Sequence, residues 1–185
     1  MTKLNNMSYL QSRFHLKQLV FCLIILISNI TLAEEEKTSE ETDASGKQLA
    51  WNFTLKSQSG KNIKLSELRG RVIALNFWDS RCGTCIQQFP VINTYYQSNK
   101  NNEFTLLSVN IDEDLLTATR FIKKRKFDYP VLLDTFNQAS RLYSVSDLPT
   151  LFLIDKDGYL RHSLDDSQIK QQKITQQVIE GLLNE

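Results

Sequence analysis

The chain has 185 residues, of which 41% are hydrophobic, 23% charged and 10% aromatic. This composition is typical of a folded globular domain and excludes a collagen-like or largely disordered chain. The 22 basic and 21 acidic residues give a net charge of +1, which excludes nucleic-acid binding driven by the charge of the whole chain.

The first 33 residues carry the features of a leader. They include three basic residues and no acidic one, and 19–27 is an unbroken apolar run that is followed by the small-residue stretch ending at Ala33. Because a membrane-spanning helix needs about 20 apolar residues, the pattern predicts a secretory signal peptide. An uncleaved anchor formed by 19–33 is the alternative. Both predict an exported, periplasmic protein, either soluble or tethered to the inner membrane.

Residues 34–48 (EEEKTSEETDASGKQ) are highly charged and show no apolar periodicity. Such a segment cannot bury enough apolar surface to fold, so it predicts a flexible acidic tether. The folded domain is therefore expected at 49–185.

The first half of this domain alternates strands and helices. Strands at 53–55 and 63–65 predict a hairpin, and a single helical turn capped by Ser66 follows. The nearly continuous apolar runs 72–78 and 104–111 predict strands buried on both faces. Between them we predict a helix from about 82 to 99, interrupted at Pro90 because its ring removes a backbone donor.

The second half continues the alternation. We predict a helix that ends in the basic run 123–126, where the helix dipole favours positive charge, then an extended segment at 129–133 and a short helix at 138–143. A hairpin of strands 150–154 and 159–163 follows, and Ser167 caps a last amphipathic helix. This order predicts an α/β fold, a three-layer α/β/α sandwich around a mixed sheet with an N-terminal β-hairpin extension.

The candidate chemistry lies in the sequence Cys82-Gly83-Thr84-Cys85, which follows a predicted buried strand and opens a predicted helix. The unpaired N–H groups and the dipole at a helix N-terminus stabilise a thiolate and lower its pKa. We therefore predict that Cys82 is exposed and attacks a substrate disulfide. The more buried Cys85 then resolves the mixed disulfide.

A cysteine pair with this spacing has two other possible uses, a zinc site and a structural disulfide. Zinc would need two further ligands, and the only histidines are His15 in the leader and His162 in a distant hairpin, so no metal is predicted. An inert structural disulfide stays open as an alternative. A bridge with a two-residue gap closes so small a loop, however, that it removes little entropy from the unfolded chain.

A proline stands just before the predicted strand 150–154, within the sequence 147–150 (DLPT). A proline at that position removes a ladder donor and can be cis.

Together these motifs resemble the TlpA/ResA branch of exported thioredoxin-fold thiol–disulfide oxidoreductases. This branch includes cytochrome c maturation reductants and is related to the AhpC/TSA redoxins. The similarity extends from about 51 to 183, in the stretches 52–55, 65–71, 75–78, 89–90, 129–134 and 148–155. It implies a cis Pro149 beside the disulfide. It also implies cysteine-containing protein substrates such as apocytochrome c, a redox partner protein that supplies or accepts electrons, and no cofactor.

The motif and this resemblance give the expected site residues. The catalytic pair is Cys82 and Cys85, and the expected substrate-binding positions are Arg81, Gly83, Thr84, Leu148, Pro149 and Thr150.

Four positions depart from the family pattern. Arg81 replaces a usual Trp, Thr84 a frequent Pro, Gln88 a frequent Glu, and Asn76 the buried Asp of thioredoxin. Neither familiar carboxylate is therefore available to move a proton at Cys85. The charge of Arg81 and the N–H of Thr84 are expected to stabilise the Cys82 thiolate and to raise the redox potential above the roughly −270 mV of thioredoxin.

Two other functions stay open on the sequence alone. One is a thiol peroxidase of the same fold, although such enzymes carry their reactive cysteine in a Pro/Thr-rich loop that is not seen here. The other is a client-binding module whose disulfide no longer turns over, which the changes at Asn76, Arg81 and Gln88 would allow.

Overall fold

The computed structural model describes residues 42, 46–100 and 102–185, and the predicted leader lies outside the described residues. The described residues belong to the unit Glu40–Glu185. Its elements are, in chain order, β1 (Thr54–Ser57), β2 (Asn62–Lys64), the 3-10 turn η1 (Leu65–Leu68), β3 (Val72–Trp78), α2 (Gly83–Asn99), β4 (Phe104–Asn110), α3 (Leu115–Arg125), β5 (Val131–Leu133), α4 (Gln138–Leu142), β6 (Thr150–Ile154), β7 (Leu160–Leu164), α5 (Asp166–Lys170) and α6 (Gln172–Asn184).

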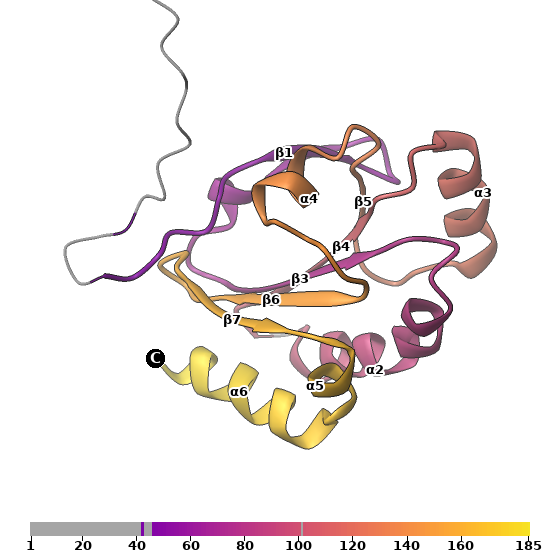
Figure 1. Cartoon of the computed structure of the whole chain (residues 1–185). Helices are drawn as coiled ribbons and strands as arrows, with labels where there is room; N and C mark the ends of the chain where they lie inside the picture. Colours follow the sequence, from indigo (N-terminus) through magenta and orange to yellow (C-terminus); the bar gives the residue numbers. More distant parts are fainter. Residues whose placement is uncertain (1–41, 43–45, 101) are drawn as a thin grey trace, which may run out of the picture. The chain divides into compact units, whose positions relative to one another are not determined.

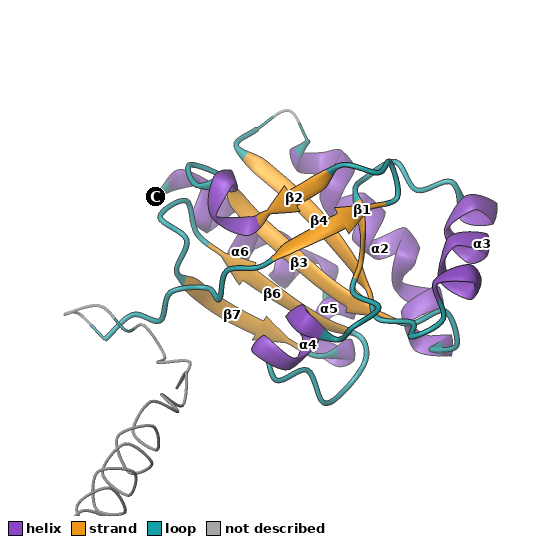
Figure 2. Ribbon diagram, turned by 90° about the horizontal axis from the view of Figure 1, so that it is seen from above, coloured by secondary structure: helices purple, strands orange, loops and turns teal. Residues whose placement is uncertain are grey.

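The strands form one seven-stranded mixed sheet in the order β2-β1-β5-β4-β3-β6-β7. β3 pairs in parallel with β4 and antiparallel with β6, so it lies in the middle of the sheet (Figure 2). Both predicted hairpins, β1–β2 and β6–β7, are present and antiparallel.

Two apolar layers cover the two faces of the sheet. On β3 the even-numbered apolar residues pack towards α2, α5 and α6, whereas the odd-numbered ones pack towards α4 and η1. Figure 1 shows α4 on one side of the sheet and α2, α5 and α6 on the opposite side. All seven residues of β3 are buried, as its continuous apolar run predicts. The predicted three-layer α/β/α sandwich is therefore confirmed.

The expected break in α2 is wrong. The helix runs from Gly83 to Asn99 with Pro90 inside it. The proline is exposed, and the loss of one backbone donor is outweighed because the neighbouring Phe89 and Ile92 bury their side chains in the core.

Both predicted serine caps are also wrong. Asp165, not Ser167, begins the last helical segment: its carboxylate accepts the Gln168 N–H at 2.9 Å, and the Gln168 side chain accepts the Asp165 N–H at 3.0 Å. This capping box holds the pKa of Asp165 below its ordinary value. The segment then divides at Gln171 into α5 and α6. Ser66 does not cap η1 either, because it lies inside that turn, and its own N–H donates to the Asn52 side chain.

The last residues of the predicted tether that the structure describes contact the β6–β7 hairpin. The Gln48 carbonyl accepts the Leu160 N–H at 2.9 Å, and the Lys47 ammonium lies 5.5 Å from the centre of the Tyr159 ring. Over the ranges that the structure describes, no helix has both the length and the apolar character needed to cross a membrane.

Tyr95 connects α2 to α5 through a buried hydrogen bond. Its hydroxyl donates to the Ile169 carbonyl at 2.6 Å, and burial raises its pKa. We expect Tyr95→Phe to lower the free energy of unfolding by about 1–2 kcal/mol, because the carbonyl loses its donor while staying buried. Urea denaturation measures this. Tyr96→Phe is the matched control, since that hydroxyl has no hydrogen-bond partner among the described residues, and an equal loss in both variants would contradict the assignment.

Candidate active site

Cys82 and Cys85 form a disulfide at the start of α2, with their Cα atoms 5.3 Å apart. Cys82 is the N-cap residue, and its Sγ accepts the Cys85 N–H at 3.1 Å. Cys85 is 1% exposed and belongs to the core beneath α2, whereas Cys82 is only partly buried. The expected position at a helix N-terminus and the expected difference in burial are both confirmed.

This geometry favours ionisation of Cys82 once the bridge is reduced. A thiolate at the N-cap accepts the same Cys85 N–H as a charge-assisted hydrogen bond and lies at the positive end of the helix dipole. The Thr84 hydroxyl lies 3.3 Å from Cys82 Sγ and can donate to it as well. The sequence predicted a contribution from the backbone N–H of Thr84 but not from this hydroxyl.

Thr84→Val is expected to raise the pKa of reduced Cys82 by about half a unit to one unit, because the thiolate loses one hydrogen-bond donor. The pH dependence of iodoacetamide alkylation measures that pKa. Thr84→Ser keeps the hydroxyl and should preserve the wild-type value. A Cys82 pKa that is equal in the Val and Ser variants would show that the hydroxyl does not contribute.

Arg81 forms hydrogen bonds and an ion pair with Asp79, a residue of the same loop. Its backbone N–H and its guanidinium bond the Asp79 carboxylate at 2.6 and 3.2 Å, and its side chain is 81% exposed. The hydrogen bond to Asp79 raises the pKa of Arg81. The Asp79 carboxylate offsets the charge of the exposed guanidinium, and solvent screens both groups. Arg81 is therefore expected to stabilise the Cys82 thiolate less than the sequence suggests.

A buried carboxylate ties the loop before Cys82 to the neighbouring loop. Asp112, which is 2% exposed and follows the last residue of β4 by two positions, accepts the Ser80 N–H at 3.0 Å and the Ser80 hydroxyl at 2.8 Å. The Asn110 amide donates to the same carboxylate at 2.6 Å. Asp114, two residues further on, is the N-cap of α3. The role of Asp112 was missed, and its position after a strand parallel to β3 was the available signal.

The predicted substrate-binding loop lies at the same end of the sheet as the disulfide. The Leu148–Pro149 peptide bond is cis, as the resemblance implies. Thr150 pairs with Phe77 near the end of β3 from which the Cys82 loop departs. Pro149 is buried, while Leu148 is half-buried and packs against both cores. The fold thus brings the two predicted groups of site residues to one edge.

Neutral amides occupy positions 76 and 88, where the resemblance implies a carboxylate. Asn76 and Gln88 are 2% and 1% exposed. The Gln88 Nε2 donates to the Asp166 carbonyl at 3.1 Å and to the Asp166 carboxylate. The Asn76 Oδ1 and the Gln88 Oε1 have no hydrogen-bond partner in the described part of the chain. Neither position therefore supplies a carboxylate, and each contains a buried amide oxygen without a hydrogen-bond donor among the described residues.

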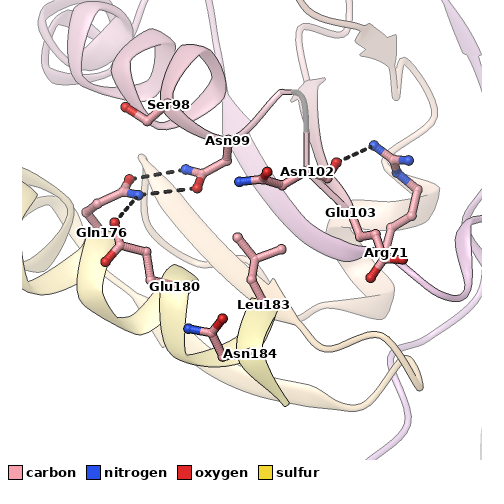
Figure 3. Close-up of a pocket in the computed structure, with 9 residues that line it drawn as sticks. All are labelled: Arg71, Ser98, Asn99, Asn102, Glu103, Gln176, Glu180, Leu183 and Asn184. Carbon is pink, nitrogen blue, oxygen red and sulfur yellow. Dashed lines mark hydrogen bonds between the residues drawn. The ribbon is translucent and has the colours of Figure 1, made fainter.

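A cavity of about 750 Å³ lies at the opposite end of α2 from the disulfide (Figure 3). It is lined by polar side chains of α2 and α6, and Asn99 and Gln176 exchange hydrogen bonds of 3.2 and 3.3 Å across it. The cavity contains no cysteine or histidine. Nowhere in the described ranges do three or more His, Cys, Asp or Glu residues group as a metal would require.

Comparisons with known proteins agree with this geometry. The family model "AhpC/TSA family" matches residues 47–163. The chain is 36% identical over 140 residues to the thiol-disulfide oxidoreductase ResA of Bacillus subtilis, covering 76% of this chain and 75% of the relative. It is 32% identical over 160 residues to ResA of Bacillus thuringiensis, covering 84% and 92%. Among solved structures, a Chlorobium tepidum protein assigned as thiol:disulfide interchange protein DsbE superposes with a TM-score of 0.63 at 32% identity, covering 70% of this chain and 96% of that one.

Proposed function

The chain belongs to the AhpC/TSA family and is a thiol–disulfide oxidoreductase with a thioredoxin-like fold, and from this premise we propose that it exchanges electrons with protein cysteines through Cys82 and Cys85. The observation that carries the proposal is their disulfide at the N-terminus of α2. There a partly exposed sulfur stands in front of a buried one.

The reaction is a pair of thiol–disulfide exchanges. The Cys82 thiolate attacks a substrate disulfide, which forms a mixed disulfide and releases one substrate thiolate. Cys85 then loses its proton and attacks Cys82 Sγ, which restores the internal disulfide and releases the second substrate thiolate. Two electrons have then passed to the substrate. The reverse sequence oxidises a substrate dithiol, and neither direction uses a metal or organic cofactor.

Residues around the two sulfurs support substrate binding at this edge. Gly83 and Thr84 are exposed beside Cys82. Leu148 and Thr150 flank the cis Pro149 at the start of β6, and an extended substrate segment is proposed to pair with the backbone there. Arg81 adds an exposed cation at the rim. These positions form the proposed substrate-binding surface.

The wider setting follows from the leader and the family. We propose export by residues 1–33, cleaved or retained as an anchor, because their charge and apolar pattern are those of a signal. The proposed substrates are cysteine-containing proteins of that compartment, apocytochrome c among them, with a separate redox protein as electron partner.

A redox titration tests whether the disulfide turns over. We expect a two-electron transition with a potential above the roughly −270 mV of thioredoxin, because the Cys85 N–H and the Thr84 hydroxyl both stabilise the Cys82 thiolate and hence the reduced form. Equilibration of the purified protein with glutathione buffers measures it. A bridge that stays oxidised below about −300 mV would instead identify a structural disulfide.

A further inference from the structure

A cavity of about 530 Å³ lies between the β1–β2 hairpin and α3. We call it the lysine groove. Its apolar lining includes Leu115 and Ile122 of α3 and Leu133 of β5, and its lysines are Lys56, Lys123 and Lys126. Both ribbon views draw α3 at the margin of the sheet (Figures 1 and 2), and Figure 1 shows it beyond β5.

The charge of this cavity is of one sign. Its lining contains three exposed lysines and no Asp or Glu. None of the three lysines forms an ion pair with another described residue. The basic run at 123–126 is therefore more than a solvated helix end, because Lys56 joins two of its members from the opposite wall. The volume falls in the range of about 300–1,000 Å³ that is typical of binding pockets.

One end of the groove reaches the part of the molecule that carries the disulfide. Leu115 lines the groove and is 50% exposed, and the adjacent Leu116 is 71% exposed. Both open α3, which follows β4, while Cys82 follows β3. Because β3 and β4 are parallel, their carboxyl ends lie at the same edge of the sheet.

We propose that the lysine groove docks a short protein segment in which Asp or Glu residues flank apolar side chains, carried by a protein that exchanges disulfides with Cys82. The inference rests on the proposed function. The lysines complement the acidic groups, and the apolar lining complements the side chains between them. The chain's own acidic stretch 34–43 (EEEKTSEETD) does not fit, because it contains no apolar residue.

Binding of a fluorescein-labelled Asp-Leu-Glu-Phe-Asp-Leu peptide to the full chain tests the proposal by fluorescence anisotropy. We expect saturable binding that weakens with salt, and about fivefold weaker binding in Lys123→Glu, where an attraction becomes a repulsion. Lys124→Glu is the matched control, since it makes the same charge change one residue away, outside the groove. Leu115→Ser should weaken binding, whereas Leu116→Ser, likewise outside the groove, should not.

Several outcomes would overturn the proposal. These are no saturable binding, equal effects of Lys123→Glu and Lys124→Glu, or equal binding of a Lys-Leu-Lys-Phe-Lys-Leu peptide. Tighter binding of dodecanoate at the same site would assign the groove to an anionic amphiphile instead. Insulin reduction driven by dithiothreitol separates this inference from the proposed function. If the protein reduces insulin but binds both peptides equally, only the proposed role of the lysine groove is contradicted. If the protein does not reduce insulin, the proposed function itself is contradicted.

Discussion

Cys82→Ser is expected to lower the rate of insulin reduction at least about a hundredfold. Cys82 is the partly exposed sulfur at the helix N-terminus, and Cys85 is too buried to replace it as the attacking group. The precipitation of reduced insulin in the presence of dithiothreitol measures this rate. A rate equal to that of the wild type would favour a client-binding module or an inert bridge.

The companion substitution Cys85→Ser separates the two steps. With Cys82 intact and no resolving thiol, mixed disulfides with substrate proteins should accumulate and be visible by mass spectrometry under non-reducing conditions. The double variant Cys82→Ser/Cys85→Ser is the control and should trap nothing. Rapid consumption of peroxide by Cys85→Ser would instead favour the thiol peroxidase reading.

Gln88→Glu is expected to destabilise the protein by at least about 2 kcal/mol at pH 8. Gln88 is buried, and its Nε2 donates to the Asp166 carboxylate. The substitution removes that donor and places a second carboxylate against the first. Urea denaturation at several pH values measures the change. Gln87→Glu, on the exposed side of the same helix turn, should have little effect.

The pH dependence of the Gln88→Glu variant has a definite sign. Burial and the charge of Asp166 raise the folded-state pKa of the introduced carboxyl above its unfolded value of about 4.3. The destabilisation is therefore present above the folded-state pKa and is relieved as the pH falls through it, because the protonated acid can donate to Asp166. A second substitution, Asp166→Asn, should restore stability at pH 8. A loss that is independent of pH and of Asp166→Asn would contradict this account.

The sequence was sufficient for the architecture because its strongest signals are local. The apolar run of β3 and the turn residues of the β6–β7 hairpin each predict one element, and their order predicts the layers. Pro90 shows the limit of this reasoning. The preference of one residue predicts a break, but the burial of a whole helix face decides the result.

The candidate site was only partly predictable. The spacing of Cys82 and Cys85 and the helix that follows were enough to place both sulfurs. The contact of Asp112 with Ser80 depends on side-chain directions across two loops that are 32 residues apart in the chain. These directions are not encoded in any local pattern. The lysine groove was missed for the same reason, since its walls are far apart in the chain.

The anchoring of Ser80 by Asp112 bears on how the protein responds to a change of redox state. Because two hydrogen bonds to Asp112 hold Ser80 in the loop before Cys82, we expect opening of the disulfide to leave that loop in place and to confine the movement to the first turn of α2. A partner protein would then bind a surface of almost the same shape in the oxidised and reduced states. Such a surface distinguishes oxidised from reduced protein by the chemistry of one exposed sulfur rather than by shape.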